Sequence, residues 1–460
     1  MDTIAAIATG SAPTAIGVIR VSGPETDAVV SRVFRPKCAK PFPALEPRRL
    51  FLGALTDRAG RTLDSGMAVR FPGPASYTGE DCAELHCHGS PAAMGEILSA
   101  LFAAGARQAR PGEFTRRAFL NGKLELTQAE AVIDLIDAQT PAAARNAAAQ
   151  LDGALARTVG QVYDALTALA SRFYAVVDYP DEDIEDLDRT KLEDTLRRAD
   201  GTLTRLLDTC GRGRVLKRGV STAIVGLPNA GKSSLLNALA GYDRAIVTSV
   251  PGTTRDTVEE SVLCGGVLLR LTDTAGIRET DDAVERLGVE RSRSAAQRAE
   301  LVLAVADGSA PLAPENEAVF ALAARCPRWV LVWSKADLAA GPRPAKAWTS
   351  PPGLSAPAAE VAVSSVTGEG LDRLEDAVRA LFPAGEAPAG QILTNARQSE
   401  AVSRARDAVR RALEALECGM TPDVILTDAE EAMNALGELT GRTAREDIVS
   451  NIFSRFCVGK

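Results

Sequence analysis

One segment, Gly226 to Ser234, contains the residue types needed to hold the phosphates of a nucleotide. It reads G-L-P-N-A-G-K-S-S and so matches the pattern G-x-x-x-x-G-K-S. Gly226 and Gly231 favour a tight turn that brings backbone N–H groups against phosphate oxygens. In this pattern the lysine, here Lys232, reaches the β and γ phosphates, and Ser233 ligates Mg²⁺. The segment therefore predicts a nucleotide-binding loop.

The sequence around this loop predicts the two elements that must position it. Residues 220–225 form an apolar run typical of a buried strand, and residues 234–240 continue as a helix that ends at Gly241. A glycine-rich loop that arose by chance would not be expected in this strand–loop–helix setting. The nucleotide contacts predicted in the loop are Asn229, Ala230, Gly231, Lys232, Ser233 and Ser234.

Two further segments supply polar groups for the metal ion and the γ-phosphate. The first reads D-T-A-G after the apolar run 267–271, so its carboxylate lies at a strand end where it can hold Mg²⁺ through water. The N–H of Gly276 can reach the γ-phosphate. Residues 251–256 read P-G-T-T-R-D and favour a switch in which a threonine closes over the ion. The contacts predicted here are Pro251, Gly252, Thr253, Thr254, Asp273, Thr274, Ala275 and Gly276.

A fourth segment indicates that the base is guanine. Residues 334–337 read S-K-A-D after the apolar run 329–333, and Asp337 can accept hydrogen bonds from both N1–H and the exocyclic amine of guanine. This tetrad is similar to the N-K-x-D signature of GTPases, with Ser334 in place of Asn, and we expect the shorter hydroxyl to weaken base binding. Residues 363–366 are a loose match to the fifth GTPase motif. The contacts predicted from the two motifs are Ser334, Lys335, Ala336, Asp337, Ser364, Ser365 and Val366.

The hydrolytic mechanism depends on the residue after Gly276, which is Ile277. Ras-type enzymes place a Gln there to orient the attacking water, and an isoleucine cannot do so. The side-chain oxygen of Asn229 could instead hold a monovalent cation against the phosphates, where an arginine finger would otherwise lie. Glu285, at the start of a helix behind the switch, is the acid that we favour for positioning water, although an acidic residue there can also serve only the helix dipole. The predicted catalytic residues are therefore Glu285, Asn229 and Lys232.

Length and composition indicate a multidomain globular protein. The chain has 460 residues, enough for about three domains, and 46% of them are hydrophobic. It lacks a charged start followed by a long apolar run, so we expect a cytoplasmic protein with no membrane segment. The eight cysteines include no C-x-x-C pair and are expected to be reduced. A net charge of −8 argues against a protein whose main role is to neutralise nucleic-acid phosphates, so a partner is expected to hold much of any RNA.

Periodicity divides the chain into a mixed α/β part, a helical part and an inserted GTPase. Strands are expected at 4–8, 15–21, 67–71 and 83–87. Helical sequence begins at a capping box at Thr127 and continues to Val177, and a second capped helix begins at Thr190. A basic link is expected at 212–218, and a linker at 383–390. C-terminal helices are expected at 395–417, 422–439 and 444–456.

These patterns predict a multidomain α/β fold class with a Ras-like P-loop domain interrupting a helical bundle. We expect the second helical part to pack on the first, so that nucleotide-driven movement of the inserted domain changes the angle between its two connections. The predicted boundaries are 1–123 for a mixed α/β domain, 124–215 for the first helical part, 216–384 for the GTPase domain, and 385–460 for the second helical part with its tail.

Four sequence blocks carry a family resemblance that covers essentially the whole chain. They are the P-loop, residues 71–81 (F-P-G-P-A-S-Y-T-G-E-D), residues 110–123 (R-P-G-E-F-T-R-R-A-F-L-N-G-K) and the tail 456–460 (F-C-V-G-K). Together these blocks resemble the MnmE (TrmE) family of tRNA-modification GTPases. The GTPase motifs alone would also fit several ribosome-assembly GTPases, whereas the other three blocks would not.

The resemblance implies a potassium-activated GTP hydrolase that acts on tRNA. With an FAD-containing partner of the MnmG (GidA) family in a hetero-oligomer, such a protein installs a carboxymethylaminomethyl or aminomethyl group at carbon 5 of the wobble uridine, position 34, of certain tRNAs. The mixed α/β domain resembles folate-binding domains of the aminomethyltransferase type, forms a homodimer, and binds 5-formyl- or 5,10-methylene-tetrahydrofolate. The GTPase domains of the dimer meet across their switches, which implies that Glu285 becomes ordered only in the transition state.

The resemblance also assigns ligands by position. It implies that K⁺ is held by Asn229 and by a loop that contains Thr248, Ser249, Val250 and Thr253, that Mg²⁺ is held by Ser233 and Thr254, and that Glu285 is the catalytic acid. The implied folate contacts are Arg20, Glu84, Lys123 and Lys460.

Strand alternation gives Glu84 independent support. If residues 82–88 form a strand, Ala83, Leu85 and Cys87 face one side while Glu84 and the two histidines of the chain face the other. Glu84 is then on a polar face and able to bind the N–H groups of a pterin. The same alternation separates Cys87 from the histidines, which makes a metal site of these residues the weaker interpretation.

Several alternatives remain beside these assignments. Cys457 is either a nucleophile or a small apolar anchor for the tail, and Lys460 is either a ligand contact or a frayed terminus. For the whole chain, one alternative is a GTP-dependent switch in ribosome assembly, which predicts a basic RNA-binding domain beside the GTPase domain, and the sequence shows no such region there. Another is a folate-dependent transferase that acts without a flavoprotein partner.

Overall fold

The computed structural model describes residues 2–10, 12–178, 189–242, 260–271, 294–338, 354–383, 387–443, 446–454 and 456–459. They form two compact units. Unit 1 comprises residues 1–133, 150–200 and 404–460, and unit 2 comprises residues 134–149 and 201–403. Each unit has its own sheet, and none of the helices that the structure describes combines the length and the apolar character needed to cross a membrane.

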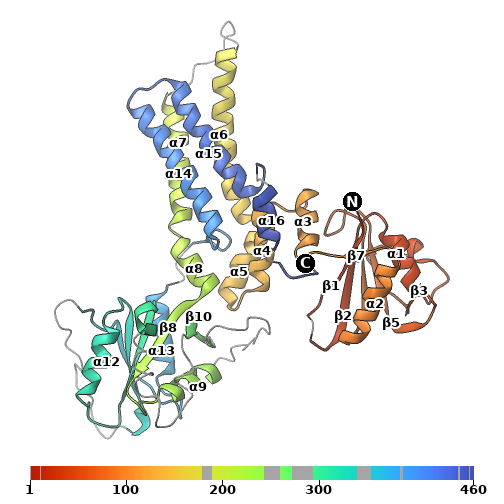
Figure 1. Ribbon diagram of the computed structural model, residues 1–460. Coiled ribbons are helices and arrows are strands. Elements are labelled where there is room, and N and C mark those ends of the chain that lie inside the picture. The colour runs from red at the N-terminus through yellow and green to blue at the C-terminus, as the bar shows by residue number, and fades with distance from the viewer. Residues whose placement is uncertain are drawn as a thin grey trace. The chain divides into compact units, whose positions relative to one another are not determined.

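The first sheet belongs to unit 1 and lies at the N-terminal end of the chain (Figure 1). Its seven strands run in the order β3-β4-β5-β6-β2-β1-β7, and all pairs are antiparallel except β1 with β7. The strands are β1 Ile4–Ile7, β2 Thr14–Ser22, β3 Phe34–Pro36, β4 Phe51–Thr56, β5 Thr62–Phe71, β6 Cys82–Gly89 and β7 Arg107–Gln108.

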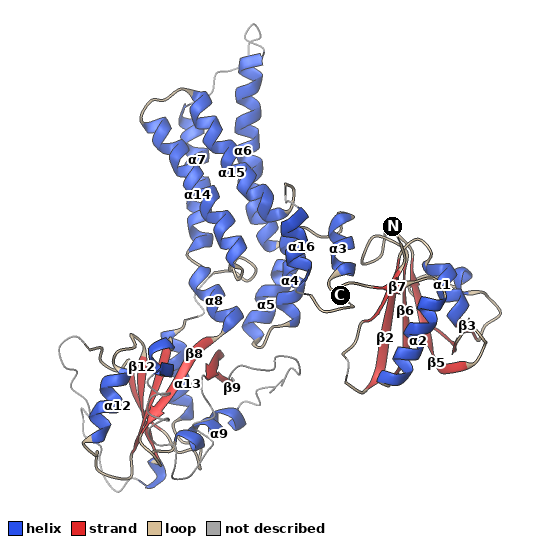
Figure 2. Ribbon diagram, in the orientation of Figure 1, coloured by secondary structure: helices blue, strands red, loops and turns tan. Residues whose placement is uncertain are grey.

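Helices cover one face of this sheet, as Figure 2 shows for α1 and α2. Apolar residues of both helices form a core with the inward residues of the strands, whereas Ile16, Leu52 and Met67 on the opposite face are exposed. The helices of this domain are α1 Thr26–Val33, α2 Pro91–Ala103 and α3 Glu113–Leu120, with the short 3-10 helix η1 Phe42–Ala44. On the opposite face, Phe114 of α3 packs with Ile4 and Ala6, so β1 is buried on both faces, whereas a strand such as β6 alternates between apolar and polar residues.

The rest of unit 1 is a helical bundle in which helices after the GTPase segment pack on helices before it. Thr167 of α6 contacts Met433 of α15 at 3.3 Å, and Arg410 of α14 pairs with Asp200 of α7 at 2.8 Å. The C-terminal tail contacts the first sheet at Gly459. A side chain at this position would collide with the carbonyl oxygen of Ile7. The elements are α4 Leu126–Ile136, α6 Ala154–Asp178, α7 Arg189–Leu207, α14 Ala396–Glu417, α15 Pro422–Thr440 and α16 Glu446–Ser454, with α4, α7 and α14 continuing into unit 2.

Unit 2 contains a six-stranded sheet between two layers of helices. The strand order is β13-β12-β11-β8-β10-β9, and every pair is parallel except β9 with β10. Apolar residues of α9 and α13 form the core on one face, and α12 forms it on the other. The elements are β8 Val220–Gly226, β9 Glu260–Cys264, β10 Val267–Leu271, β11 Leu301–Asp307, β12 Trp329–Ser334, β13 Ala359–Ala362, α5 Pro141–Leu151, α8 Cys210–Arg218, α9 Lys232–Tyr242, α12 Glu315–Ala323, α13 Leu371–Leu381 and η2 Ala336–Leu338.

This organisation confirms the predicted fold class. The helical sequence expected over 127–177 forms three helices, α4, α5 and α6. The capping box at Thr127 is absent because α4 already begins at Leu126, and the backbone N–H of Glu125 instead donates to Gln128 Oε1 at 2.9 Å. The basic link expected at 212–218 is helical, since it belongs to α8, which ends at Arg218 just before β8.

Candidate functional site

The P-loop lies at the carboxyl end of β8, where the strand order of the second sheet reverses. In the sheet, β8 lies between β11 on one side and β10 on the other, so it is the switch point at which the strand order reverses. Open α/β sheets bind ligands at such a switch point. β8 ends at Gly226, and α9 begins at Lys232. A side chain on Gly226 would meet the Val305 carbonyl oxygen at 2.5 Å, so this glycine permits close packing against β11, and its predicted part in the turn stays a prediction.

Two residues inside the loop adopt backbone conformations that explain their types. Gly231 has a φ of 91°, and Asn229 has a φ of 60°. A left-handed conformation is uncommon for residues other than glycine, and asparagine tolerates it better than most. Asn229 therefore has a backbone role in addition to the cation-binding role predicted for its side chain, which is exposed at the loop surface.

The lysine of the loop is held ready by two carbonyl groups. Lys232 Nζ donates to the carbonyl oxygens of Gly226 at 2.9 Å and Leu227 at 2.8 Å. Burial lowers the pKa of Lys232 because it removes the ammonium from water. These two hydrogen bonds keep the charged group inside the loop, where phosphate oxygens would be its next partners.

Ser334, at the end of β12, joins the guanine motif to the P-loop. Its hydroxyl lies 2.6 Å from the Ala230 carbonyl oxygen and 3.2 Å from that of Ala306, and the side chain is buried. A Cβ on Gly231 would lie only 3.1 Å from the Ser334 side chain, so the two segments touch. We expected the serine to weaken base binding, and the structure instead shows its hydroxyl engaged with the backbone of the P-loop.

We predict that Ser334→Ala lowers GTP affinity by about tenfold, because it leaves the buried Ala230 carbonyl without its donor, a loss of about 1–3 kcal/mol. Titration with a fluorescent GTP analogue measures this effect. Thr367→Ala is a suitable control, since its hydroxyl only accepts an exposed turn N–H from Glu369 at 3.3 Å. Unchanged affinity in Ser334→Ala would show that the hydroxyl does not support the loop.

The remaining residues of the two base motifs lie at the same sheet edge. Lys335 has a φ of 54°, and its Nζ pairs with Asp307 Oδ2 at 2.6 Å. The backbone N–H of Ala336 donates to the Val363 carbonyl at 3.2 Å, which places the tetrad beside the fifth motif. Asp337 is exposed and available to a base.

In the fifth motif, Ser364 is fully buried, and its Oγ accepts N–H groups of Val366 at 3.3 Å and Thr367 at 3.1 Å. Ser365 is half-buried and Val366 is exposed. Ser364 therefore shapes the turn, which leaves the backbone and the side chains of the next two residues at the surface.

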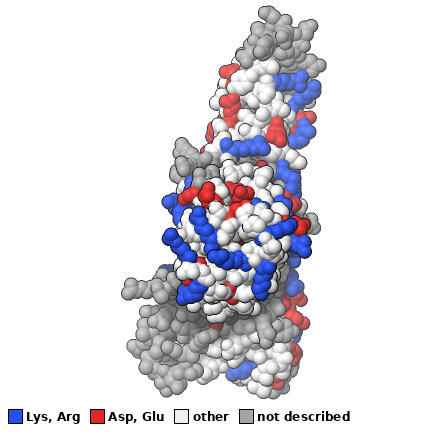
Figure 3. Space-filling view, turned by 90° about the vertical axis from the view of Figure 1, so that its right-hand side faces the viewer, with Lys and Arg blue, Asp and Glu red and all other residues white. Residues whose placement is uncertain are grey.

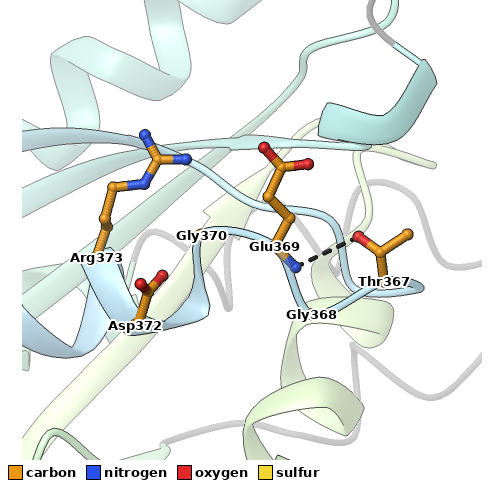
Figure 4. A pocket seen from close by; sticks show the side chains of 6 residues that line it. All are labelled: Thr367, Gly368, Glu369, Gly370, Asp372 and Arg373. Carbon is orange, nitrogen blue, oxygen red and sulfur yellow. Dashed lines mark hydrogen bonds between the residues drawn. The ribbon is translucent and has the colours of Figure 1, made fainter.

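One cavity lies just beyond the fifth motif, in the turn that leads into α13. Its volume is about 540 Å³, and Figure 4 shows the side chains that line it. Gly370 there has a φ of 81° and leaves no room for a side chain beside the Ala362 carbonyl, so this turn packs closely on the end of β13. No residue of the predicted nucleotide motifs lines the cavity, and we assign it no ligand. The lining residues are Thr367, Gly368, Glu369, Gly370, Asp372 and Arg373.

Several predicted residues fall outside the part of the chain that the structure describes. They include the whole switch and the whole D-T-A-G segment, together with the favoured catalytic acid and the last folate contact. Their roles stay predictions. These residues are Thr248, Ser249, Val250, Pro251, Gly252, Thr253, Thr254, Asp273, Thr274, Ala275, Gly276, Glu285 and Lys460.

In unit 1, two of the predicted folate contacts meet on the face of the first sheet opposite to α1 and α2, where they are about one-fifth exposed. Arg20 on β2 is opposite Glu84 on β6, and its Nε and Nη2 donate to Glu84 Oε1 at 3.0 and 2.8 Å. As alternation predicted, Ala83, Leu85 and Cys87 face the core while Glu84 does not. Lys123 is exposed, and its Cγ would contact a Cβ on Gly79 at 3.4 Å.

The structure adds three residues to this cluster that the sequence did not single out as ligands. The Arg20 guanidinium lies 5.2 Å from the ring centre of Tyr77 and 5.7 Å from that of Phe114. His86 Nε2 lies 3.6 Å from Glu84 Oε2, is buried, and has no hydrogen-bond partner among the described residues. Tyr77 and Phe114 belong to the two family blocks at 71–81 and 110–123, which was the available signal.

A metal site at the histidines finds no support in the described part of the chain. No group of three or more His, Cys, Asp and Glu side chains in that part is placed to hold a metal ion. His88 instead pairs with Asp64 at 2.8 Å on the surface, and Cys87 is buried on the core face, where burial raises its pKa to about 11.

Comparison with known proteins decides the family. Residues 3–123 match the family model of the GTP-binding protein TrmE N-terminus, and residues 126–457 match that of the MnmE helical domain. The chain belongs to the MnmE family. Similar relatives are the tRNA modification GTPases MnmE of Heliobacterium modesticaldum and Akkermansia muciniphila, each 42% identical, and that of Symbiobacterium thermophilum, 43% identical. Each alignment covers 100% of this chain and 99% of the relative.

Among solved structures, Era from Aquifex aeolicus bound to GDP and AlF4⁻ aligns with 41% of this chain and 65% of its own. The identity is 26% and the TM-score is 0.26, so the superposition adds nothing to the family assignment. As a member of the MnmE family, the chain is a GTP-binding GTP hydrolase of tRNA modification.

Proposed function

We propose that this MnmE family member is a potassium-activated GTPase that modifies carbon 5 of the wobble uridine in certain tRNAs. In this proposal a flavoprotein resembling MnmG and a tetrahydrofolate one-carbon donor complete the reaction, and the protein works as a cytoplasmic homodimer. The observation that carries it is the presence of two separate sites in one chain, the P-loop and base motifs of unit 2 and the Arg20–Glu84 cluster of unit 1.

The nucleotide site contains groups suited to hydrolysis without a catalytic glutamine. Lys232 is charged and held in the loop by two carbonyls, and Asn229 carries an exposed amide oxygen on a backbone turned by its positive φ. We infer that Asn229, with Thr248, Val250 and Thr253, holds K⁺ and that Ser233 and Thr254 hold Mg²⁺. These ions supply the positive charge that stabilises the transition state, and Glu285 positions the attacking water.

The cluster of unit 1 fits a folate. A pterin presents an amino group and ring N–H groups to a carboxylate, and Glu84 keeps Oε2 free of any hydrogen bond from Arg20. The buried, unpartnered His86 Nε2 and the Tyr77 ring lie in the same cluster. We infer that Arg20, Glu84, Lys123 and Lys460 hold the folate, which supplies a one-carbon unit when bound.

The experiment that tests this function is nucleoside analysis of tRNA from a strain that lacks the gene. We expect the C5-modified wobble uridines to disappear while other modified nucleosides persist. Restoration by the wild-type gene but not by a Lys232→Ala gene would link the loss to GTP hydrolysis. An unchanged nucleoside profile would contradict the proposal.

The cation mechanism predicts that the GTPase rate rises at least tenfold when K⁺ replaces Na⁺ at equal ionic strength, because an ion of the right size completes the charge that an arginine finger would supply. Phosphate release measures the rate. Glu285→Ala should abolish hydrolysis in K⁺ and keep GTP affinity within about threefold. Equal rates in the two salts would sink the cation mechanism, and loss of GTP affinity in Glu285→Ala would indicate a structural role.

The folate assignment predicts that Glu84→Gln weakens binding of 5-formyl-tetrahydrofolate to the full chain by about tenfold or more, since a neutral amide loses a charge-assisted hydrogen bond. Calorimetric titration measures this. Asp64→Asn, which alters the surface pair with His88, serves as the control. Equal affinities of wild type and Glu84→Gln would remove the cluster from the folate site.

A further inference from the structure

Basic residues gather along one edge of the first sheet. Residues 31–61 contain eight Lys and Arg and two Asp and Glu, although the whole chain has a net charge of −8. We call this set the basic edge. Its members are Arg32, Arg35, Lys37, Lys40, Arg48, Arg49, Arg58 and Arg61.

The strand register places the residues of the basic edge in a row along the outermost strand. β3 is the outermost strand, and Arg35 on it pairs with Ala54 of β4. The N–H of Lys37 continues this pairing to the Leu52 carbonyl, so the loop that holds Lys40, Arg48 and Arg49 begins at the Phe51 end of β4. A strand of the length of β4 spans about 20 Å, and the basic edge extends over at least that distance.

The other end of the basic edge consists of residues from α1 and from the turn between β4 and β5. Thr56 at the end of β4 donates to the carbonyl of Val33 at 3.4 Å, which places Arg32 near that end. Arg58 and Arg61 follow in the turn from β4 to β5. The cations therefore come from three separate segments of the chain that the sheet brings to one edge.

Most of these charges are not neutralised. Arg49 pairs with Glu46 at 3.1 Å, and Arg61 pairs with Asp57 at 3.1 Å and with Glu96 at 3.5 Å. The guanidinium groups of Arg32 and Arg48 donate only to backbone carbonyls, which leaves their charge intact. Within the described residues, the four others have no carboxylate partner, and their side chains are exposed; they are Arg35, Lys37, Lys40 and Arg58.

Figure 3 looks onto the side of this domain on which Figure 1 places β3. Lys and Arg side chains form a band across that face, and the acidic side chains collect mainly above the band. A continuous positive band of this kind is the electrostatic pattern expected of a surface that meets a polyanion.

We infer that the basic edge binds the phosphate backbone of the tRNA substrate. The inference rests on the tRNA-modifying function, which supplies a polyanion as substrate. Extended spacing along a strand edge suits a phosphate chain, and the Arg49 guanidinium, 5.6 Å from the Phe51 ring centre, offers a flat polar surface at one end. Lysine and arginine also protect edge strands from pairing with other sheets, which is the competing explanation.

The test is a salt titration of tRNA binding to the full chain, followed by fluorescence anisotropy with an unmodified tRNA transcript. The variant Lys37→Gln, Lys40→Gln, Arg58→Gln removes three exposed cations that have no partner in the described structure. We expect its affinity at about 0.1 M salt to fall about 10- to 100-fold and the slope of log K against log salt to shrink by about 2.

The control variant Arg197→Gln, Arg404→Gln, Arg411→Gln removes the same charge from exposed pairs of the helical bundle. We expect its affinity and slope to stay near those of the wild type. Equal effects of the two variants would overturn the inference, because net charge alone would then explain them. Intact tRNA binding with increased self-association of the first variant would assign the basic edge to edge protection.

Two further outcomes separate this inference from the function on which it rests. If the wild type binds no tRNA at any salt concentration, the inference fails, whereas the proposed function, in which a partner takes part, fails only if the C5-modified uridines persist in the strain that lacks the gene. If the first variant binds tRNA normally but loses an acidic protein partner in a pull-down with the purified partner, the basic edge is a protein contact and only the inference fails.

Discussion

Gly213→Ala is expected to destabilise unit 2 by about 3 kcal/mol, because α8 passes directly against the segment that leaves the GTPase sheet. A Cβ on Gly213 would lie 1.7 Å from the Leu393 carbonyl oxygen and 2.6 Å from the Leu393 carbonyl carbon. Both atoms belong to the backbone, so the chain must move, and overpacking of this kind costs about 1–3 kcal/mol or more. The change acts where the two connections of the GTPase domain meet.

Hydrogen bonds hold the segment at Leu393 against α8, so a backbone shift there would have a large free-energy cost. The N–H of Leu393 donates to Thr209 Oγ1 at 3.0 Å, just before α8 begins. Asn146 of α5 accepts from the N–H of Gly390 at 2.8 Å and donates to the Ile392 carbonyl at 3.2 Å. A backbone shift at Leu393 would break several of these contacts, each worth about 1 kcal/mol. The two connections of the GTPase domain, α8 and the segment 390–393, should therefore move together when the GTPase sheet moves.

Tryptophan fluorescence during urea unfolding measures this effect selectively, since all three tryptophans of the chain lie within the range of unit 2. Gly211→Ala is a matched control on the same helix, because a Cβ there would meet no atom within 4 Å. It should leave unit 2 as stable as the wild type or more stable by up to about 1 kcal/mol. If both variants unfold at the wild-type urea concentration, the junction is not tightly packed.

The sequence predicted those features of the nucleotide site that follow from local pattern. The apolar runs before Gly226 and before Ser334 indicated parallel strands, and parallel strands bring their carboxyl ends to one edge of a sheet. Contacts between distant segments were not predictable in this way. Nothing in the residues around Ser334 indicates that its hydroxyl reaches the Ala230 carbonyl, since 104 positions separate them along the chain.

The N-terminal cluster shows the same limit. Period-two alternation was enough to place Glu84 on the polar face, because one face of the sheet is covered by helices. Alternation does not say which residue lies opposite on the next strand, so the pair with Arg20 could be found only from the register. The helical sequence predicted over 127–177 is helical, but alanine-rich sequence favours helix throughout and does not indicate where α4, α5 and α6 begin and end.

Arg117→Met is expected to destabilise unit 1 by about 3–5 kcal/mol, because Arg117 is the cation of a buried ion network. Its guanidinium donates to Glu80 Oε2 at 3.0 Å and to Glu113 Oε1 at 3.1 Å, and all three side chains are almost fully buried. Methionine fills a similar volume but leaves Glu80 without a cation, whereas Glu113 keeps its pair with Arg107. Removing one partner of a buried ion pair leaves an uncompensated buried charge. This destabilises the fold far more than replacing the whole pair by apolar residues of similar volume.

The pH dependence of this network has a definite sign. Burial raises the pKa of Glu113, but hydrogen bonds from Arg107, the Arg110 backbone and Arg117 outweigh it and lower that pKa to about 2, against an ordinary value of 4.5. A carboxyl group whose pKa is lowered by folding stabilises the fold above its ordinary pKa, and this stabilisation is lost as the pH falls toward about 2. The difference between wild type and Arg117→Met should therefore be largest above pH 5 and shrink as the solution is acidified.

Circular dichroism during urea unfolding at pH 7 and pH 3.5 reports both units, and tryptophan fluorescence reports unit 2 alone, so a change seen only by circular dichroism belongs to unit 1, whose range contains no tryptophan. Arg197→Met, which removes an exposed arginine paired with Glu193 and Glu417, is the control and should change the stability of unit 1 far less, because solvent screens exposed pairs. A loss in Arg117→Met that matches this control, or that grows on acidification, would contradict a buried network held by carboxylate charge. A loss confined to the circular dichroism transition, with fluorescence unchanged, would place the network in the stability of unit 1 alone.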